Sequence, residues 1–153
     1  MGQVPLLENG LGLDGLPSVA GPVPRDAVQH PVWSQDSRYA RLKFFANELL
    51  EVEFRPRTVL AVETVRELWD LADTRLERKV QYLLVDLCGL DSVKSDVASL
   101  IDHMTEGMRI ALLGSGPADR VLARFFMRKV DPGRRYAYFE NRQDALAYFH
   151  END

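Results

Sequence analysis

Two serines in one short polar segment are the side chains best placed to carry a modification. Ser92 and Ser95 lie in the polar stretch 91–95, which we predict to be a loop directly ahead of a helix ending near residue 104. A phosphate there would face the unpaired amides and the positive dipole end of that helix, which both favour an anion. The purely structural alternative is that Ser95 or Asp96 only caps the helix. The candidate phosphorylation or partner loop is Ser92, Lys94, Ser95 and Asp96.

A glycine-rich turn is the second candidate site. Gly114, Ser115 and Gly116 follow an apolar strand, and Pro117 suits the first position of a helix. Backbone amides in such a turn can hold a phosphate or a carboxylate. The segment has neither the full dinucleotide-binding glycine pattern nor a Walker lysine. The alternative is that the glycines serve only a tight turn.

A basic stripe follows on the same predicted helix. Arg120, Arg124 and Arg128 are spaced four residues apart and therefore share one helix face. Such a face suits an acidic partner, an anionic lipid surface or nucleic acid. The alternative is a solvated face whose arginines pair with nearby carboxylates. The acidic residues considered for that pairing are Asp119, Asp131 and Glu140.

No recognisable catalytic or metal-binding set appears in the sequence. Cys88 is the single cysteine, so an intramolecular disulfide is impossible, and we expect its thiol to fill a small buried space. Asp86 follows an apolar run without a partner in a known catalytic pattern. The three histidines, His30, His103 and His150, share no metal-ligand spacing. We therefore predict no metal, no cofactor and no enzymatic activity.

Composition and charge narrow the class of protein. The chain has 153 residues, a formal net charge of −4 and a pI of about 5.4. That length suits one domain, and an acidic chain on average repels phosphate backbones, so we expect no nucleic-acid partner. No apolar run is long enough to span a bilayer, and no signal peptide is recognisable at the N-terminus. A cytoplasmic location is the resulting expectation.

The first 37 residues differ from the rest of the chain. Residues 1–37 hold five of the eight prolines and five of the ten glycines, a density that no helical or strand period survives. We predict a disordered N-terminal arm at 1–37, with partner docking as a further hypothesis, followed by one α/β domain at 38–153.

The domain alternates strands with helices. The predicted order is strand, strand, helix, strand, helix, strand, helix, strand, helix, with a hairpin at 41–54 and an amphipathic helix over 62–76. The stretches 82–87 and 109–113 are short and almost wholly apolar, which is typical of strands buried on both faces. We predict a mixed, mostly parallel sheet of about five strands, in which these two stretches are central neighbours, covered by four helices.

Three segments resemble STAS-type domains, the fold of anti-sigma-factor antagonists. Residues 84–90 are similar to the strand that precedes the phosphorylatable serine loop of that family. Residues 111–126 and 138–149 resemble a group of actinobacterial STAS-like proteins of unknown function. The resemblance covers about residues 40–150 and implies a SpoIIAA-like fold. In an ungapped match, Asp96 takes the position of the usual phosphoserine.

These observations lead to two functional hypotheses. The resemblance implies a non-catalytic regulatory module that binds a partner protein through residues 91–104. The alternative is a small-molecule or lipid carrier or sensor, because the aromatic residues between 125 and 148 suit an apolar pocket. A homodimer is a further expectation, since Leu42, Phe44 and Phe45 offer more apolar surface than one sheet face needs.

Overall fold

Two short apolar strands form the centre of the fold. The computed structural model describes residues 30–76, 80–128 and 135–150. In it β5 (Tyr82–Asp86) and β7 (Arg109–Leu113) pair in parallel, with Leu83 opposite Ile110 and Leu84 opposite Ala111. The prediction that these stretches are neighbouring central strands is confirmed.

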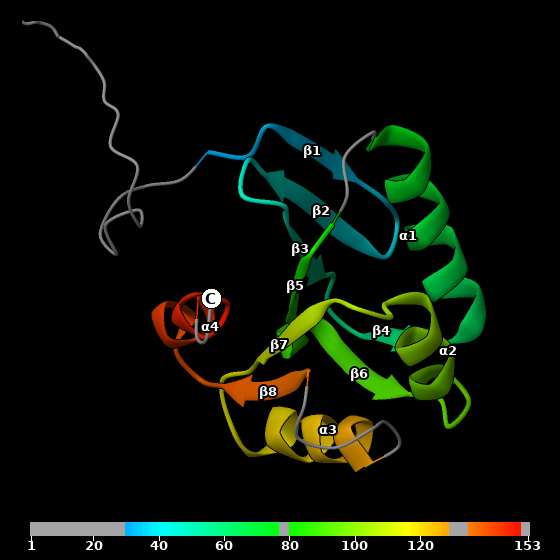
Figure 1. Ribbon diagram of the computed structural model, residues 1–153. Helices are drawn as coiled ribbons and strands as arrows, with labels where there is room; N and C mark the ends of the chain where they lie inside the picture. Colours follow the sequence, from blue (N-terminus) through cyan, green and yellow to red (C-terminus); the bar gives the residue numbers. More distant parts are fainter. Residues whose placement is uncertain (1–29, 77–79, 129–134, 151–153) are drawn as a thin grey trace, which may run out of the picture.

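Four more strands extend this pair into one mixed sheet. The sheet order is β1-β2-β3-β5-β7-β8, in which β1, β2 and β3 are antiparallel and the pairs from β3 to β8 are parallel (Figure 1). The added strands are β1 (Trp33–Asp36), β2 (Ala40–Phe45), β3 (Leu49–Phe54) and β8 (Tyr136–Phe139).

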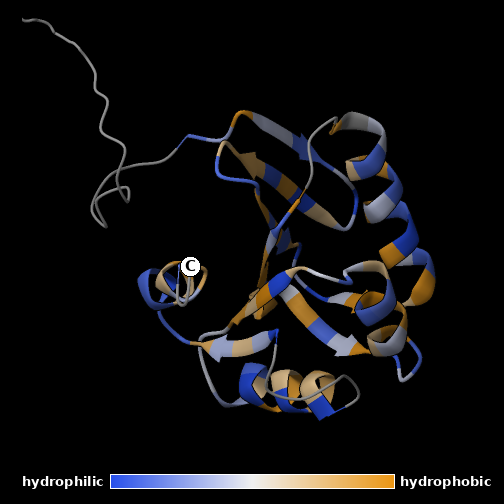
Figure 2. Ribbon diagram, viewed as in Figure 1, coloured by the Kyte–Doolittle hydropathy of each residue, from blue (hydrophilic) through white to orange (hydrophobic). Residues whose placement is uncertain are grey.

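The helices cover the two sheet faces unequally. On one face lie α1 (Val62–Arg75), α2 (Val97–Met104) and α3 (Pro117–Arg128), whereas α4 (Arg142–Tyr148) lies on the other (Figure 1). Strand side chains alternate between the faces, so Leu83 joins the larger apolar cluster and Leu84 the smaller one under α4. Figure 2 shows apolar and polar residues mixed along the helices, as expected for helices with one buried side.

A small second sheet closes one end of the larger face. β4 (Thr58–Leu60) pairs in parallel with β6 (Leu90–Val93), and a 3₁₀ turn over Leu87–Gly89 joins β5 to β6. Thr64 anchors the start of α1 here, because its hydroxyl donates to the Val59 carbonyl and accepts from the Ala61 amide. This end of the fold therefore positions both α1 and the chain that leads into α2.

The expected α/β class is confirmed. Three details of the prediction are corrected: the number of strands in the sheet, the end of the arm predicted at 1–37, and the loop predicted at 91–95. The sheet has six strands rather than about five, because β1 lies inside the segment 1–37 predicted as a disordered arm and pairs along β2. Residues 1–29 of that predicted arm lie outside the described residues. The stretch 91–95 is not wholly a loop, since β6 continues to Val93.

The apolar side chains invoked for a dimer are used within the protomer. Leu42 and Phe44 are each 1% exposed and belong to the large core, while Phe45 packs in the cluster under α4. β1 also occupies the outer edge of β2. The expectation that these residues offer an exposed apolar edge is therefore wrong.

Gly89 sets the approach of the 3₁₀ turn to β3. A Cβ atom built at Gly89 would overlap the carbonyl of Phe54 and lie 2.7 Å from the carbonyl oxygen of Arg55. We expect Gly89→Ala to lower the free energy of unfolding by about 2–3 kcal/mol, because backbone atoms must shift to admit the methyl group. Urea denaturation measures this change.

Gly116→Ala is the matched control. A Cβ atom at Gly116 meets nothing within 4 Å. We expect its free energy of unfolding to stay within about 0.5 kcal/mol of the wild type. Equal destabilisation by the two substitutions would contradict the close approach at Gly89.

Candidate functional site

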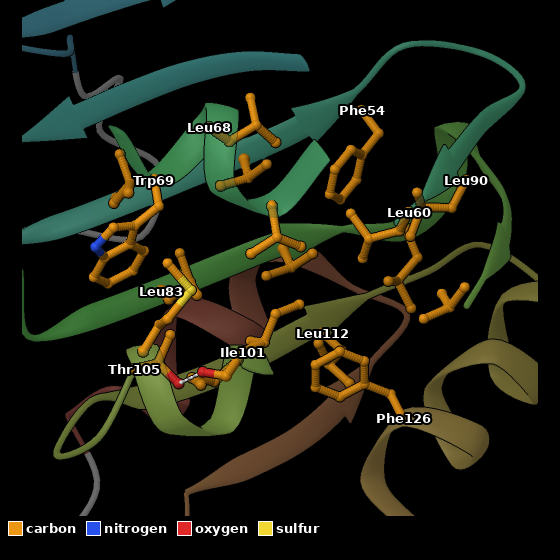
Figure 3. A pocket seen from close by; sticks show the side chains of 18 of the residues that line it. Phe54, Leu60, Leu68, Trp69, Leu83, Leu90, Ile101, Thr105, Leu112 and Phe126 are labelled. Carbon is orange, nitrogen blue, oxygen red and sulfur yellow. Dashed lines mark hydrogen bonds between the residues drawn. The ribbon is translucent and has the colours of Figure 1, made fainter. Parts of the chain in front are cut away.

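A hollow lies inside the larger apolar layer. A cavity of about 90 Å³ sits between the sheet and the elements that cover this face. Side chains from the sheet, from α1, α2 and α3, and from β4 and β6 converge on it (Figure 3). The side chains labelled there are Phe54, Leu60, Leu68, Trp69, Leu83, Leu90, Ile101, Thr105, Leu112 and Phe126.

The cavity wall offers almost nothing to a polar molecule. Thr105 is the one hydroxyl-bearing residue of the lining, and its hydroxyl donates to the Ile101 carbonyl at 2.7 Å (Figure 3). All other lining residues are aliphatic or aromatic or contain sulfur. A water molecule needs two or more polar partners to remain in such a space, so the lining favours an apolar occupant.

An empty cavity of this size is costly for a small domain. At about 24 cal/mol per Å³, leaving 90 Å³ unfilled costs roughly 2 kcal/mol. The total stability of a domain is only about 5–15 kcal/mol. An apolar occupant would recover part of that cost through the packing contacts that the empty wall lacks.

A cluster of polar side chains next to the cavity holds the C-terminal end of α2. The Arg135 guanidinium donates to the carbonyls of Thr105 at 2.7 Å and Met108 at 2.9 Å, and to the Asp102 carboxylate at 2.6 Å. The Tyr136 hydroxyl donates to the same carboxylate at 3.2 Å, and burial raises the pKa of Tyr136 to about 12. These contacts tie the C-terminal end of α2 to β8.

The predicted phosphorylation loop is divided between two environments. Ser92 is half-buried in β6 opposite Val59, whereas Lys94, Ser95 and Asp96 are exposed. Asp96 occupies the N-cap position of α2, but its side chain makes no capping hydrogen bond. The predicted N-cap position is therefore confirmed for Asp96 without a hydrogen bond from its side chain. Ser95 is the accessible serine of the two.

A carboxylate of the protein itself already binds the glycine-rich turn. The Asp119 carboxylate accepts from the Ser115 amide at 2.9 Å and from the Ser115 hydroxyl at 3.3 Å. Gly114 leaves room for this arrangement, because a Cβ there would lie 2.6 Å from both the Asp119 Cβ and the Tyr138 hydroxyl. An anion bound at Gly114, Ser115 and Gly116 would have to approach a buried carboxylate.

The basic stripe is partly neutralised within the protein. Arg120 donates to the Glu140 carboxylate at 2.7 Å, which also accepts from the Tyr138 hydroxyl at 2.9 Å. This is one of the pairings expected for a solvated face. Arg124 and Arg128 are exposed on α3.

Cys88 lies at the surface, so the prediction that it fills a buried space is wrong. A hydrogen bond to Ser115 lowers the pKa of the thiol, but burial and the carboxylates of Asp86 and Asp119 outweigh it, leaving the pKa above its ordinary value. A protonated thiol is a weak nucleophile. Asp86 accepts from the Cys88 amide at 3.0 Å and thereby caps the 3₁₀ turn.

Metal and membrane features are absent from the described residues. Within 30–76, 80–128 and 135–150, no three His, Cys, Asp or Glu side chains gather as a metal site would require. In the same ranges no helix combines the length and apolar character needed to cross a bilayer.

Among solved structures, the chain is similar to an uncharacterized protein of the DUF3478 family from Shewanella loihica PV-4, described as having a SpoIIAA-like fold. The TM-score is 0.46 at 17% identity, over 81% of this chain and 97% of that chain. This likeness is too low to carry an argument, and the α/β class assigned above rests on the strand order and helices. No family model matches the chain, and no curated protein matches it significantly.

The sequence suggested an apolar pocket among the aromatic residues between 125 and 148, but it indicated neither the residues that line this cavity nor the cluster around Arg135. The cavity-lining positions have the same apolar pattern as ordinary core positions, and Phe126 is the labelled aromatic residue that the expected pocket region 125–148 contributes. Tyr148 instead packs in the cluster under α4. Asp102 and Arg135 are 33 residues apart, so no local spacing links them.

Asp119 gives a direct test of the glycine-rich turn. We expect Asp119→Ala to lower the free energy of unfolding by about 1 kcal/mol, because the Ser115 amide loses its acceptor at the start of α3. Asp119→Asn keeps a side-chain oxygen and should retain most of that stability. Thermal denaturation of both variants measures the difference, and equal losses would contradict this capping role.

Proposed function

We propose that this protein is a non-catalytic binding protein that holds a small apolar molecule, or the apolar end of a larger one, in its interior cavity. The observation that carries the proposal is the cavity of about 90 Å³ with an almost wholly apolar wall. Asp86, Asp119 and Glu140 each accept hydrogen bonds from neighbouring groups, and none of them lines the cavity.

The lining also limits the chemical class of the ligand. A carboxylate, amide or hydroxyl buried in this space would lose its hydration without gaining a partner, at a cost of about 1–3 kcal/mol or more. The part of the ligand inside the cavity is therefore a hydrocarbon group. Any polar part of the same molecule would have to stay outside the apolar wall.

Filling the cavity tests this proposal. Ala72 lies on α1 and is one of the smallest lining residues. We expect Ala72→Leu to weaken fluorobenzene binding by about tenfold or more, because the larger side chain takes part of the space and further crowding costs about 1–3 kcal/mol. Fluorine NMR titration measures the affinity.

Ala118→Leu is the matched control, since Ala118 is an exposed helical alanine on α3. The Ala118→Leu variant should bind fluorobenzene with the affinity of the wild type. Undiminished binding by a folded Ala72→Leu variant would exclude the cavity as the site. A wild-type protein that binds neither fluorobenzene nor xenon would contradict the proposal as a whole.

A second candidate function is regulation through a partner protein, as in the antagonists that the sequence resembles. The exposure of Lys94, Ser95 and Asp96 next to α2 favours it. We expect protein purified from its native cells to carry phosphate on Ser95 in intact-mass and peptide measurements. Ser95→Ala should abolish that modification and Ser92→Ala should not, since Ser92 is half-buried in β6. Native protein without phosphate on Ser95 would count against this candidate.

A further inference from the structure

The helix α2 forms part of the cavity wall and is short. It spans eight residues, Val97–Met104, and contributes Ile101 and Met104 to the lining, with Thr105 directly after it. Its inner side is held by packing, since Val97 and Ala98 are fully buried. Moving the C-terminal half of α2 outward would widen access to the cavity.

Both connections of α2 allow such movement. Before the helix, Lys94, Ser95 and Asp96 are exposed, and the Asp96 side chain makes no capping bond. After it, the buried Thr105 would move with the helix. Beyond Thr105, Glu106 and Gly107 are exposed, and Gly107 has a φ of +87°, a conformation that glycine adopts without strain. Short exposed connections of this kind can absorb the backbone rotation that a moving helix requires.

Two polar side chains that are adjacent in the sequence hold the C-terminal end of α2. Arg135 binds the carbonyls of Thr105 and Met108 together with the Asp102 carboxylate, and Tyr136 binds the same carboxylate. The Arg135 guanidinium also lies 5.3 Å from the centre of the Tyr136 ring. We call Asp102, Arg135 and Tyr136 the α2 latch.

We propose that the α2 latch controls exchange of the apolar ligand, which enters and leaves the cavity when Asp102 separates from Arg135 and the end of α2 moves outward. This inference rests on the proposed function. It names the residues that regulate the same cavity.

The partial exposure of the ion pair between Asp102 and Arg135 supports a contact that can break and form again. The side chains of Arg135 and Asp102 are 25% and 32% exposed, so both ions can regain water when they separate. The ion pair between Arg142 and Glu51 is different, because the Glu51 side chain is only 6% exposed and would remain buried without a partner. Breaking a pair of partly exposed ions costs less than leaving a buried charge unpaired.

Exchange kinetics of fluorobenzene test the α2 latch. We expect Asp102→Ala to raise the fluorobenzene release rate about tenfold, since it removes one charge-assisted bond from Arg135 and one bond from Tyr136. Asp102→Asn keeps an acceptor without the charge and should give an intermediate rate. Fluorine NMR exchange measurements on the full chain give these rates.

Glu67→Ala is the matched control. Glu67 lies on α1, another helix of the cavity wall, and pairs with Arg38 at 3.0 Å. Its loss should change the release rate by no more than about twofold, because an exposed pair contributes little. Equal release rates in Asp102→Ala, Glu67→Ala and the wild type would overturn the α2 latch while leaving the proposed function intact.

Amide hydrogen exchange of the ligand-free protein tests the α2 latch independently of the proposed function. In the empty protein, we expect the amides of α2 to exchange about tenfold faster in Asp102→Ala than in Glu67→Ala. Unchanged α2 exchange in Asp102→Ala would overturn the α2 latch whatever the binding result. If the wild type binds no apolar probe, the proposed function fails, and with it the role of the α2 latch in ligand exchange.

Discussion

The burial of β5 and β7 on both faces is the constraint on which the rest of the structure depends. Their side chains are apolar on both sides, so each face needs a covering layer that water cannot reach. Parallel pairing of these strands also requires a crossover connection, and α2 occupies that position in the chain. The order of strands and helices along the described residues follows from meeting these two requirements together.

The two covering layers are unequal, and this inequality gives the molecule its cavity. One short helix, α4, covers the smaller face, where Leu84, Ala111 and Ala145 are fully buried. The larger face must accommodate α1, α2, α3 and the small β4–β6 sheet around the wider middle of the main sheet. Elements that approach from several directions leave about 90 Å³ among them.

Charged side chains in this fold hold elements together at the rim of the apolar layers. Glu51 accepts two hydrogen bonds from Arg142 and so attaches α4 to β3. Asp119 orders the turn before α3, and Arg135 secures the end of α2. These charged groups lie outside the lining of the cavity, which consists almost wholly of apolar side chains.

Periodicity in the sequence determined the helices, most strands and the parallel centre of the sheet, because those features depend on neighbours along the chain. Tertiary structure decided what depends on distant residues. Asp102 met Arg135 from 33 residues away, and Glu51 met Arg142 from 91 residues away. Only the tertiary structure could show the cavity, because the sequence does not distinguish an apolar residue that packs against a neighbour from one that faces a cavity.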